Sequence, residues 1–186
     1  NRRPTSKEKI LKDITSHRRV NDILLGPLER PALKWLAAHT PAWITPDTLT
    51  GIGILGTLMV GAGYLLTLVH PAFLWLASLG YVVNWYGDSL DGTLARYRNI
   101  ERPRFGFYID HTVDIFNEII IVLCLGISHY VRFDLACIAL IGYLLLSNLV
   151  MILTYTTGEF RISYGKLGPT EVRVILILAN TIAFFS

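Results

Sequence analysis

Charged side chains are scarce in this chain of 186 residues. Only 17% of its residues are Asp, Glu, Lys or Arg, whereas 52% are hydrophobic, and residues 48–69 contain no charged side chain. So low a content of charge excludes a typical soluble domain. An uncharged segment of 22 residues is long enough to cross the ~30 Å hydrocarbon core of a bilayer. We therefore interpret the chain as an integral membrane protein.

Cysteine is also nearly absent. Cys124 and Cys137 are the two cysteines, they lie inside apolar runs, and no CxxC spacing is present. This pattern indicates neither a disulfide framework nor a zinc site, and we expect both side chains to be small packing residues.

Basic side chains are absent from most of the apolar part of the chain. Nine of the 17 Lys and Arg residues lie in residues 1–45, and all the others except Arg132 lie in residues 96–104 and 161–173. Such segregation indicates membrane topology and attraction to anionic lipid or nucleotide, not a nucleic-acid patch. We expect no nucleic-acid partner, and we place the three basic regions on the cytoplasmic side.

The order of apolar and polar segments predicts an all-α, polytopic transmembrane bundle. Residues 1–45 are expected to form a cytoplasmic N-terminal segment with amphipathic interfacial helices, and residues 46–186 a transmembrane catalytic domain. Because the span count is odd and the chain closes on an apolar run, we expect the domain to be C-terminally incomplete, with a sixth span missing. The expected interfacial helices cover 7–25 and Pro31 to about His39, and the five expected spans cover 48–69, 71–98, 106–128, 135–155 and 171–186.

Residues 51–56 match the dinucleotide-binding pattern GxGxxG. No strand is predicted before the motif and no βαβ unit surrounds it, so the mechanism behind that pattern is absent. We instead predict close helix packing through small residues, namely Gly51, Gly53, Gly56, Gly61 and Gly63.

Four aspartates lie at the ends of two apolar segments. Asp88 and Asp91 are three residues apart and Asp110 and Asp114 are four apart, so each pair projects from one helix face. Four carboxylates within a membrane would cost about 10–14 kcal/mol if unpaired, and we expect no Lys or Arg in the apolar parts of the helices to match them. Hard oxygen ligands suit Mg²⁺ or Mn²⁺, and two such ions would balance four carboxylates. A hydrogen-bonded acid cluster and an ion pathway remain alternatives.

The same stretch reads D-x₂-D-G-x₂-A-R-x₉-G-x₃-D-x₃-D, which resembles the signature of the CDP-alcohol phosphotransferase (CDP-alcohol phosphatidyltransferase) family of phospholipid-synthesising membrane enzymes. Residues 44–50 also resemble the family's entry into its first span, although Asp47 stands where Asn is common, and its role stays open. Besides the four aspartates, the signature residues are Gly92, Ala95, Arg96 and Gly106.

The resemblance implies a six-span helical fold, a homodimer, and transfer of a substituted phosphate from a CDP-alcohol to an acceptor hydroxyl with release of CMP. It implies that Asp88, Asp91 and Asp110 hold two Mg²⁺ or Mn²⁺ ions on the diphosphate, and that Asp114 completes the site and takes the acceptor's proton. It also implies that three small residues admit the cytidine, namely Gly92, Ala95 and Gly106.

Further candidates keep two interpretations each. Arg96 could pair with a phosphate or anchor the helix end in the headgroups. His111 could merely face a neighbour, but DHxxD resembles the choline and ethanolamine phosphotransferase branch, so it is also a candidate base. Glu118 could be a structural hydrogen-bonding acid or could line the acceptor site. Arg161 and Lys166, with Arg173, could bind a phosphorylated acceptor or simply flank the spans.

The donor stays open between CDP-diacylglycerol, attacked by a water-soluble alcohol, and a CDP-amino-alcohol, attacked by diacylglycerol. Two other classes are weighed as well. A Mg²⁺-dependent membrane prenyltransferase using an isoprenyl diphosphate would also pair two aspartate-rich motifs, but the glycine, alanine and arginine pattern argues against it. An intramembrane cation transporter would use the acids as a pathway.

Overall fold

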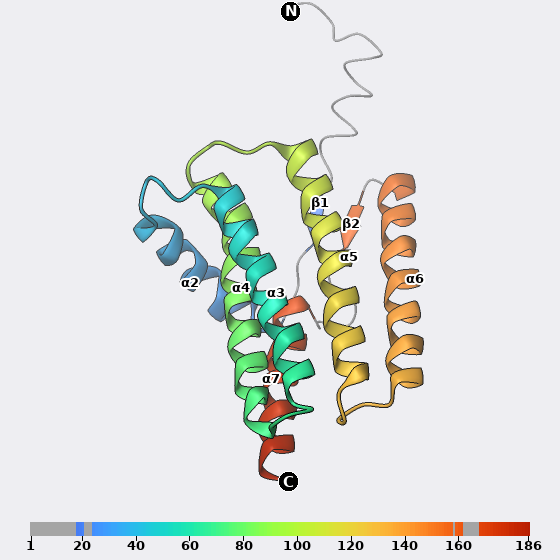
Figure 1. Cartoon of the computed structure of the whole chain (residues 1–186). Helices are drawn as coiled ribbons and strands as arrows, with labels where there is room; N and C mark the ends of the chain where they lie inside the picture. Colours follow the sequence, from blue (N-terminus) through green and yellow to red (C-terminus); the bar gives the residue numbers. More distant parts are fainter. Residues whose placement is uncertain (1–17, 21–23, 158, 162–167) are drawn as a thin grey trace, which may run out of the picture.

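A bundle of helices makes up most of the part of the chain that the structure describes. The computed structural model describes residues 18–20, 24–157, 159–161 and 168–186 (Figure 1). Within them, a single pair of three-residue strands is the only non-helical regular element, so the all-α prediction is confirmed apart from that pair. The elements are β1 (Arg18–Val20), α2 (Gly26–His39), α3 (Pro46–Leu66), the short 3₁₀ helix η1 (Pro71–Phe73), α4 (Leu74–Tyr97), α5 (Pro103–Ile127), α6 (Phe133–Thr157), β2 (Glu159–Arg161) and α7 (Pro169–Phe185).

Each of the five segments predicted as spans forms a helix, with ends within a few residues of those expected. Among the described residues, two helices are long and apolar enough to cross a membrane, Pro46–Leu66 in α3 and Phe133–Leu153 in α6. Apolar side chains are exposed along much of α6. The number of spans stays a prediction.

The N-terminal helix predictions need two corrections. The helix over 7–25 is wrong at Arg18–Val20, which is a strand paired in parallel with Glu159–Arg161; residues 7–17 and 21–23 lie outside the described residues. Long-range backbone pairing here overrides a weak helical period. The second helix ends at His39 as predicted but begins at Gly26 rather than near Pro31.

Tertiary contacts explain this early start of α2. The carboxylate of Glu29 accepts a hydrogen bond of 2.8 Å from the Trp85 indole and one of 2.7 Å from the Thr170 hydroxyl. The first turn is thereby tied to α4 and α7, although Pro31 removes one helical hydrogen bond. Further along α2, Leu33 and Ala37 are buried in one cluster with apolar side chains of α3 and α4.

The tightest contact in the bundle is between α3 and α4, which lie side by side (Figure 1). A Cβ added to Gly63 would lie 2.5 Å from the amide nitrogen of Ala77, and one added to Gly80 would lie 2.6 Å from that of Val60. Small residues therefore let the two backbones touch. The prediction of close packing is confirmed for Gly53, Gly56, Gly61 and Gly63, but it is wrong for Gly51, whose Cβ would meet nothing within 4 Å.

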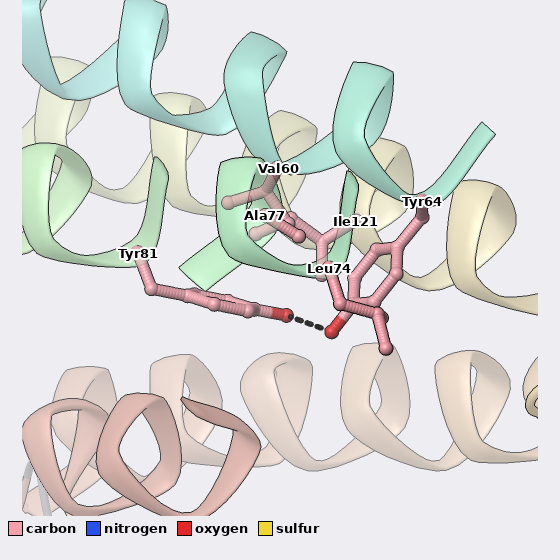
Figure 2. Packing of buried hydrophobic residues seen from close by; sticks show 6 residues of the cluster. All are labelled: Val60, Tyr64, Leu74, Ala77, Tyr81 and Ile121. Atoms are coloured by element: carbon pink, nitrogen blue, oxygen red, sulfur yellow. Dashed lines mark hydrogen bonds between the residues drawn. The ribbon is translucent and has the colours of Figure 1, made fainter. Parts of the chain in front are cut away.

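One apolar core with a polar centre joins α3, α4, α5 and α7. Figure 2 shows Tyr64 and Tyr81 reaching across it, with their hydroxyls 3.2 Å apart. The Tyr64 hydroxyl also donates to the Asn180 amide oxygen at 3.1 Å, and the Asn180 amide nitrogen donates to the Ser78 hydroxyl at 3.2 Å. Buried polar groups that satisfy one another in this way fix the register of α7 against α3 and α4.

The end of α4 is held beside the start of α3. Asn99 closes α4 in the left-handed conformation with φ 56°, a backbone region that Asn tolerates better than most residues. The Arg98 guanidinium donates to the carbonyls of Ile44, Thr40 and Pro41 at 2.6 to 2.9 Å. At the start of α3 the Thr45 hydroxyl accepts a hydrogen bond of 3.2 Å from the Thr48 amide and caps the helix.

Candidate active site

The four aspartates of the sequence motif form one electrostatic cluster. Asp88 and Asp91 lie in the second half of α4, and Asp110 and Asp114 lie in the first half of α5. The Asp114 carboxyl group interacts electrostatically with the charges of Asp88, Asp110 and Asp91. The Asp91 carboxyl group interacts in the same way with those of Asp88 and Asp110. The hydrophobic faces that pack α3 against α4 and α5 thus bring two pairs of carboxylates from different helices together.

Asp91 is oriented by groups from two helices. One carboxylate oxygen accepts a hydrogen bond of 2.6 Å from the Thr50 hydroxyl on α3, and the other accepts one of 2.5 Å from the Gly92 amide. Thr50 reaches this position because α3 and α4 lie in backbone contact. No feature of the sequence singled out Thr50, since its partner is 41 residues away.

Asp88 is paired with an arginine from the far end of the chain. The Arg173 guanidinium on α7 donates to an Asp88 carboxylate oxygen at 2.6 Å and, through Nε, to the Asn84 amide oxygen at 2.8 Å. The side chains of Arg173 and Asp88 are only 14% and 20% exposed. The expectation that no basic side chain matches the acids is therefore wrong for Asp88.

A local pattern marks the face of α7 that carries this arginine. Arg173 and Asn180 are seven residues apart in a mostly apolar helix, a spacing that places both on one helix face. Both side chains turn inward, Arg173 to α4 and Asn180 to Tyr64 and Ser78. A polar pair at that spacing could have marked the inner face of α7 and excluded Arg173 as a simple flanking charge.

The small residues of the motif differ in their surroundings. A Cβ added to Gly92 would lie 3.3 Å from a terminal nitrogen of Arg96, so the guanidinium covers this glycine. Arg96 is exposed and donates to the Thr93 hydroxyl at 3.2 Å. Gly106 has open space where a Cβ would lie, and Ala95 is half-buried. Their roles toward cytidine and phosphate stay predictions.

His111 and Glu118 both lie on α5, on either side of Asp114 in sequence. The Nδ1 atom of His111 is 2.8 Å from the Phe107 carbonyl, and the two rings lie 4.1 Å apart between centroids. Glu118 is half-buried, and the charge of Arg173 acts on it. The charges of Glu118 and Asp114 also interact electrostatically with the Tyr143 hydroxyl on α6. This part of the cluster on α5 therefore lies near α6 as well.

Arg161 and Lys166 are the remaining basic residues that could bind a phosphorylated acceptor or flank the spans. Lys166 lies outside the described residues, as does the side chain of Arg161 in β2. Asp47, whose role the sequence left open, forms an exposed ion pair with Arg102 that joins the start of α3 to the residue before α5.

The donor set of the cluster fits a hard divalent cation, because it consists of carboxylate oxygens that repel one another without added positive charge. Within the described part of the chain, however, no group of three or more His, Cys, Asp or Glu side chains converges closely enough to hold a metal ion. Asp88 and Asp91 are turned to Arg173 and Thr50 instead. The metal ligands Asp88, Asp91, Asp110 and Asp114 therefore stay a prediction.

The bundle is mostly apolar and carries paired aspartate motifs on two of its helices. The chain belongs to the CDP-alcohol phosphatidyltransferase family, whose sequence profile matches residues 43–185. The match contains all eight residues of the signature, so the resemblance noted from the sequence is confirmed.

Relatives with two different names match the chain. The chain is 26% identical to cholinephosphotransferase 1 of Gallus gallus over 170 residues, covering 87% of this chain and 50% of the relative. It is 28% identical to cholinephosphotransferase 1 of Mus musculus, covering 94% and 46%. It is 36% identical to archaetidylinositol phosphate synthase of Pyrococcus horikoshii over 121 residues, covering 65% and 59%. The chain thus spans about half the length of the cholinephosphotransferases it matches.

Proposed function

We propose that the protein is a phospholipid-synthesising transferase that moves a substituted phosphate group from a CDP-alcohol to an acceptor hydroxyl and releases CMP. The observation that carries the proposal is the clustering of Asp91 and Asp114 with Asp88 and Asp110 from two helices, in a chain of the CDP-alcohol phosphatidyltransferase family. Family membership favours this reaction over prenyl transfer and cation transport, the two alternatives raised by the acids alone.

In this proposal the four aspartates would hold two Mg²⁺ or Mn²⁺ ions. Such ions supply positive charge that stabilises the diphosphate as its bridging bond breaks. Thr50 and the Gly92 amide hold Asp91 in a fixed orientation, which a ligand for a metal requires.

At phosphorus the reaction forms one bond to oxygen and breaks another. The acceptor oxygen attacks the phosphorus that bears the alcohol, the bond from that phosphorus to the bridging oxygen breaks, and CMP leaves with the bond's electron pair. Asp114 takes the proton of the acceptor hydroxyl, because it lies in the cluster with the other three carboxylates. Gly92, Ala95 and Gly106 admit the cytidine, and Arg96 pairs with a phosphate.

We also propose how the helices are arranged in a membrane. The two helices long and apolar enough to span a bilayer, α3 and α6, support an integral membrane protein. We place α4, α5 and α7 in the membrane with them, put the acid cluster on the cytoplasmic side with the basic connections, and assign α2 to the interface. The exposed Trp35 and Leu28 on α2 suit that depth. A homodimer is part of the same proposal.

A CDP-amino-alcohol is the proposed donor, with diacylglycerol as acceptor. This choice is supported by His111 in the DHxxD motif and by the cholinephosphotransferases, which match over most of the chain. CDP-diacylglycerol with a phosphorylated alcohol as acceptor is the second candidate. The relative named as archaetidylinositol phosphate synthase favours it, with the higher identity over a shorter region.

The test is CMP release by purified protein in lipid nanodiscs with Mn²⁺. One arm supplies CDP-choline and diacylglycerol, and the other supplies CDP-diacylglycerol with inositol phosphate or glycerol phosphate. We expect metal-dependent CMP formation in one arm, and its loss in Asp91→Asn and Asp110→Asn.

Asp134→Asn is the matched control for these substitutions. Asp134 is an exposed aspartate paired with Arg132 at the start of α6, so it tests the same change of carboxylate to amide away from the cluster. CMP release that survives Asp91→Asn and Asp110→Asn would reject the assigned site. Consumption of an isoprenyl diphosphate in place of CDP-alcohols would reject the reaction.

A further inference from the structure

The side chain of Arg173 lies among acidic groups from two other helices. It contacts Asp88 on α4, and its charge also acts on Asp114 and Glu118 of α5. A guanidinium in this position offsets part of the repulsion among the carboxylates. It does so from α7, which follows α4 and α5 in the chain.

The position of the guanidinium is fixed by a separate set of contacts. Nε of Arg173 donates to the Asn84 amide oxygen at 2.8 Å. The Asn84 amide nitrogen donates in turn to the Gly53 carbonyl at 3.0 Å and the Thr57 hydroxyl at 3.1 Å. Asn84 is thereby locked at the contact between α3 and α4, and it aims Arg173 at Asp88. The planar guanidinium donates to two separate acceptors, which fixes its orientation more strictly than the single ammonium group of a lysine would be fixed.

We propose that Arg173 is the built-in counter-cation of the acid cluster, which holds Asp88 while no divalent cation is bound and releases it when one binds. The proposal rests on the metal site of the proposed function. A cation bound at Asp88 would share the carboxylate with the guanidinium, which contacts one of its two oxygens, and would repel the guanidinium, so the two compete. Arg173 is then a positioning residue that sets how tightly the site binds metal and keeps the metal-free protein folded.

The test is Mn²⁺ binding to the full chain in nanodiscs, followed by electron paramagnetic resonance without nucleotide, together with thermal unfolding in EDTA and in saturating Mn²⁺. In Arg173→Gln we expect the Kd for Mn²⁺ to fall about tenfold or more, because the competing charge is gone. We expect its Tm to fall in EDTA and most of that deficit to disappear with Mn²⁺. A purely structural role would not tighten metal binding.

Two further variants keep the test decisive. Arg132→Gln removes an exposed arginine before α6, and we expect neither its Kd nor its Tm to change much. Arg173→Lys keeps the charge but loses the fork, so we expect a smaller tightening, and it replaces Arg173→Gln if that variant does not fold.

Equal or weaker Mn²⁺ binding in both Arg173 variants, or an equal loss of Tm with and without Mn²⁺, would overturn the proposal. Wild-type protein that binds no Mn²⁺ would instead refute the metal site itself, and with it the proposed mechanism. The two failures are therefore told apart by the wild-type titration alone.

Discussion

The hydroxyl of Thr50 on α3 donates a hydrogen bond of 2.6 Å to the carboxylate of Asp91 on α4. This bond links the first helix of the α3 and α4 pair directly to the acid cluster. Because Thr50 also donates to the Pro46 carbonyl at 3.2 Å, its hydroxyl is shared between its own helix and Asp91. The orientation of Asp91 thus depends on a residue outside the family signature.

Thr50→Val should therefore lower CMP release about 10–100-fold, the usual effect of losing a group that orients a metal ligand. Valine keeps the shape of threonine but cannot donate, so Asp91 would lose one of its two observed donors. We also expect a higher Mn²⁺ concentration for half-maximal rate. Thr50→Ser is the control, because it keeps the hydroxyl and should retain most of the activity. Equal activity in the valine and serine variants would show that the bond does not orient Asp91 for the reaction.

Replacing Gly87 by Ala should strongly destabilise the bundle. A Cβ at Gly87 would overlap the backbone of Gly53 and Leu49, and backbone cannot move aside as a flexible side chain can. We expect a loss of about 1–3 kcal/mol, the cost of overpacking a filled interface, measured as a lower Tm in nanodiscs. Gly51→Ala is the matched control on the same pair of helices, since its Cβ would meet nothing within 4 Å. If both variants lowered Tm equally, the effect would come from helix propensity or lipid contact instead.

The helices and the acid cluster could be predicted from local patterns, whereas their partners could not. Apolar segments and the spacing of the aspartates depend on neighbouring residues, so the predicted spans are helices and the four acids share one cluster. The Arg173 pair with Asp88 joins residues 85 apart, and the strand at Arg18–Val20 depends on Glu159–Arg161. Contacts so distant in sequence depend on how helices are arranged, which no local period encodes. The error at Gly51 has the same cause, because only the packed pair shows which glycines face the partner helix.

Asn180→Leu should destabilise the attachment of α7. Its amide bridges the Tyr64 and Ser78 hydroxyls inside the bundle, and leucine would leave these buried groups without that partner. We expect a loss of about 1–3 kcal/mol for unsatisfied buried polar groups, read from thermal unfolding. Thr181→Val is the control, because the Thr181 hydroxyl bonds only to the Ile177 carbonyl of its own helix among the contacts described.

A double-mutant cycle with Tyr64→Phe tests whether the bridge itself is responsible. If Asn180 acts through Tyr64, the double variant should lose less stability than the sum of the single variants, by about 0.5–3 kcal/mol. Additive losses would mean that Asn180→Leu acts by its shape in the core, and the bridge would then contribute nothing specific.

The Asp47 pair with Arg102 should matter far less than the Asp88 pair with Arg173, although both join two helical regions through a carboxylate and a guanidinium. The side chains of Arg102 and Asp47 are 52% and 65% exposed, so water and salt screen their attraction, and such pairs contribute about 0–1 kcal/mol. We expect Asp47→Asn to change Tm only slightly at low salt and not at all at high salt, with CMP release nearly unchanged. Thermal unfolding at two salt concentrations, with Arg102→Gln measured alongside, checks this. A salt-independent loss of stability in both variants would mean that the pair holds the starts of α3 and α5 together, and a loss of CMP release alone would give Asp47 a part in the reaction.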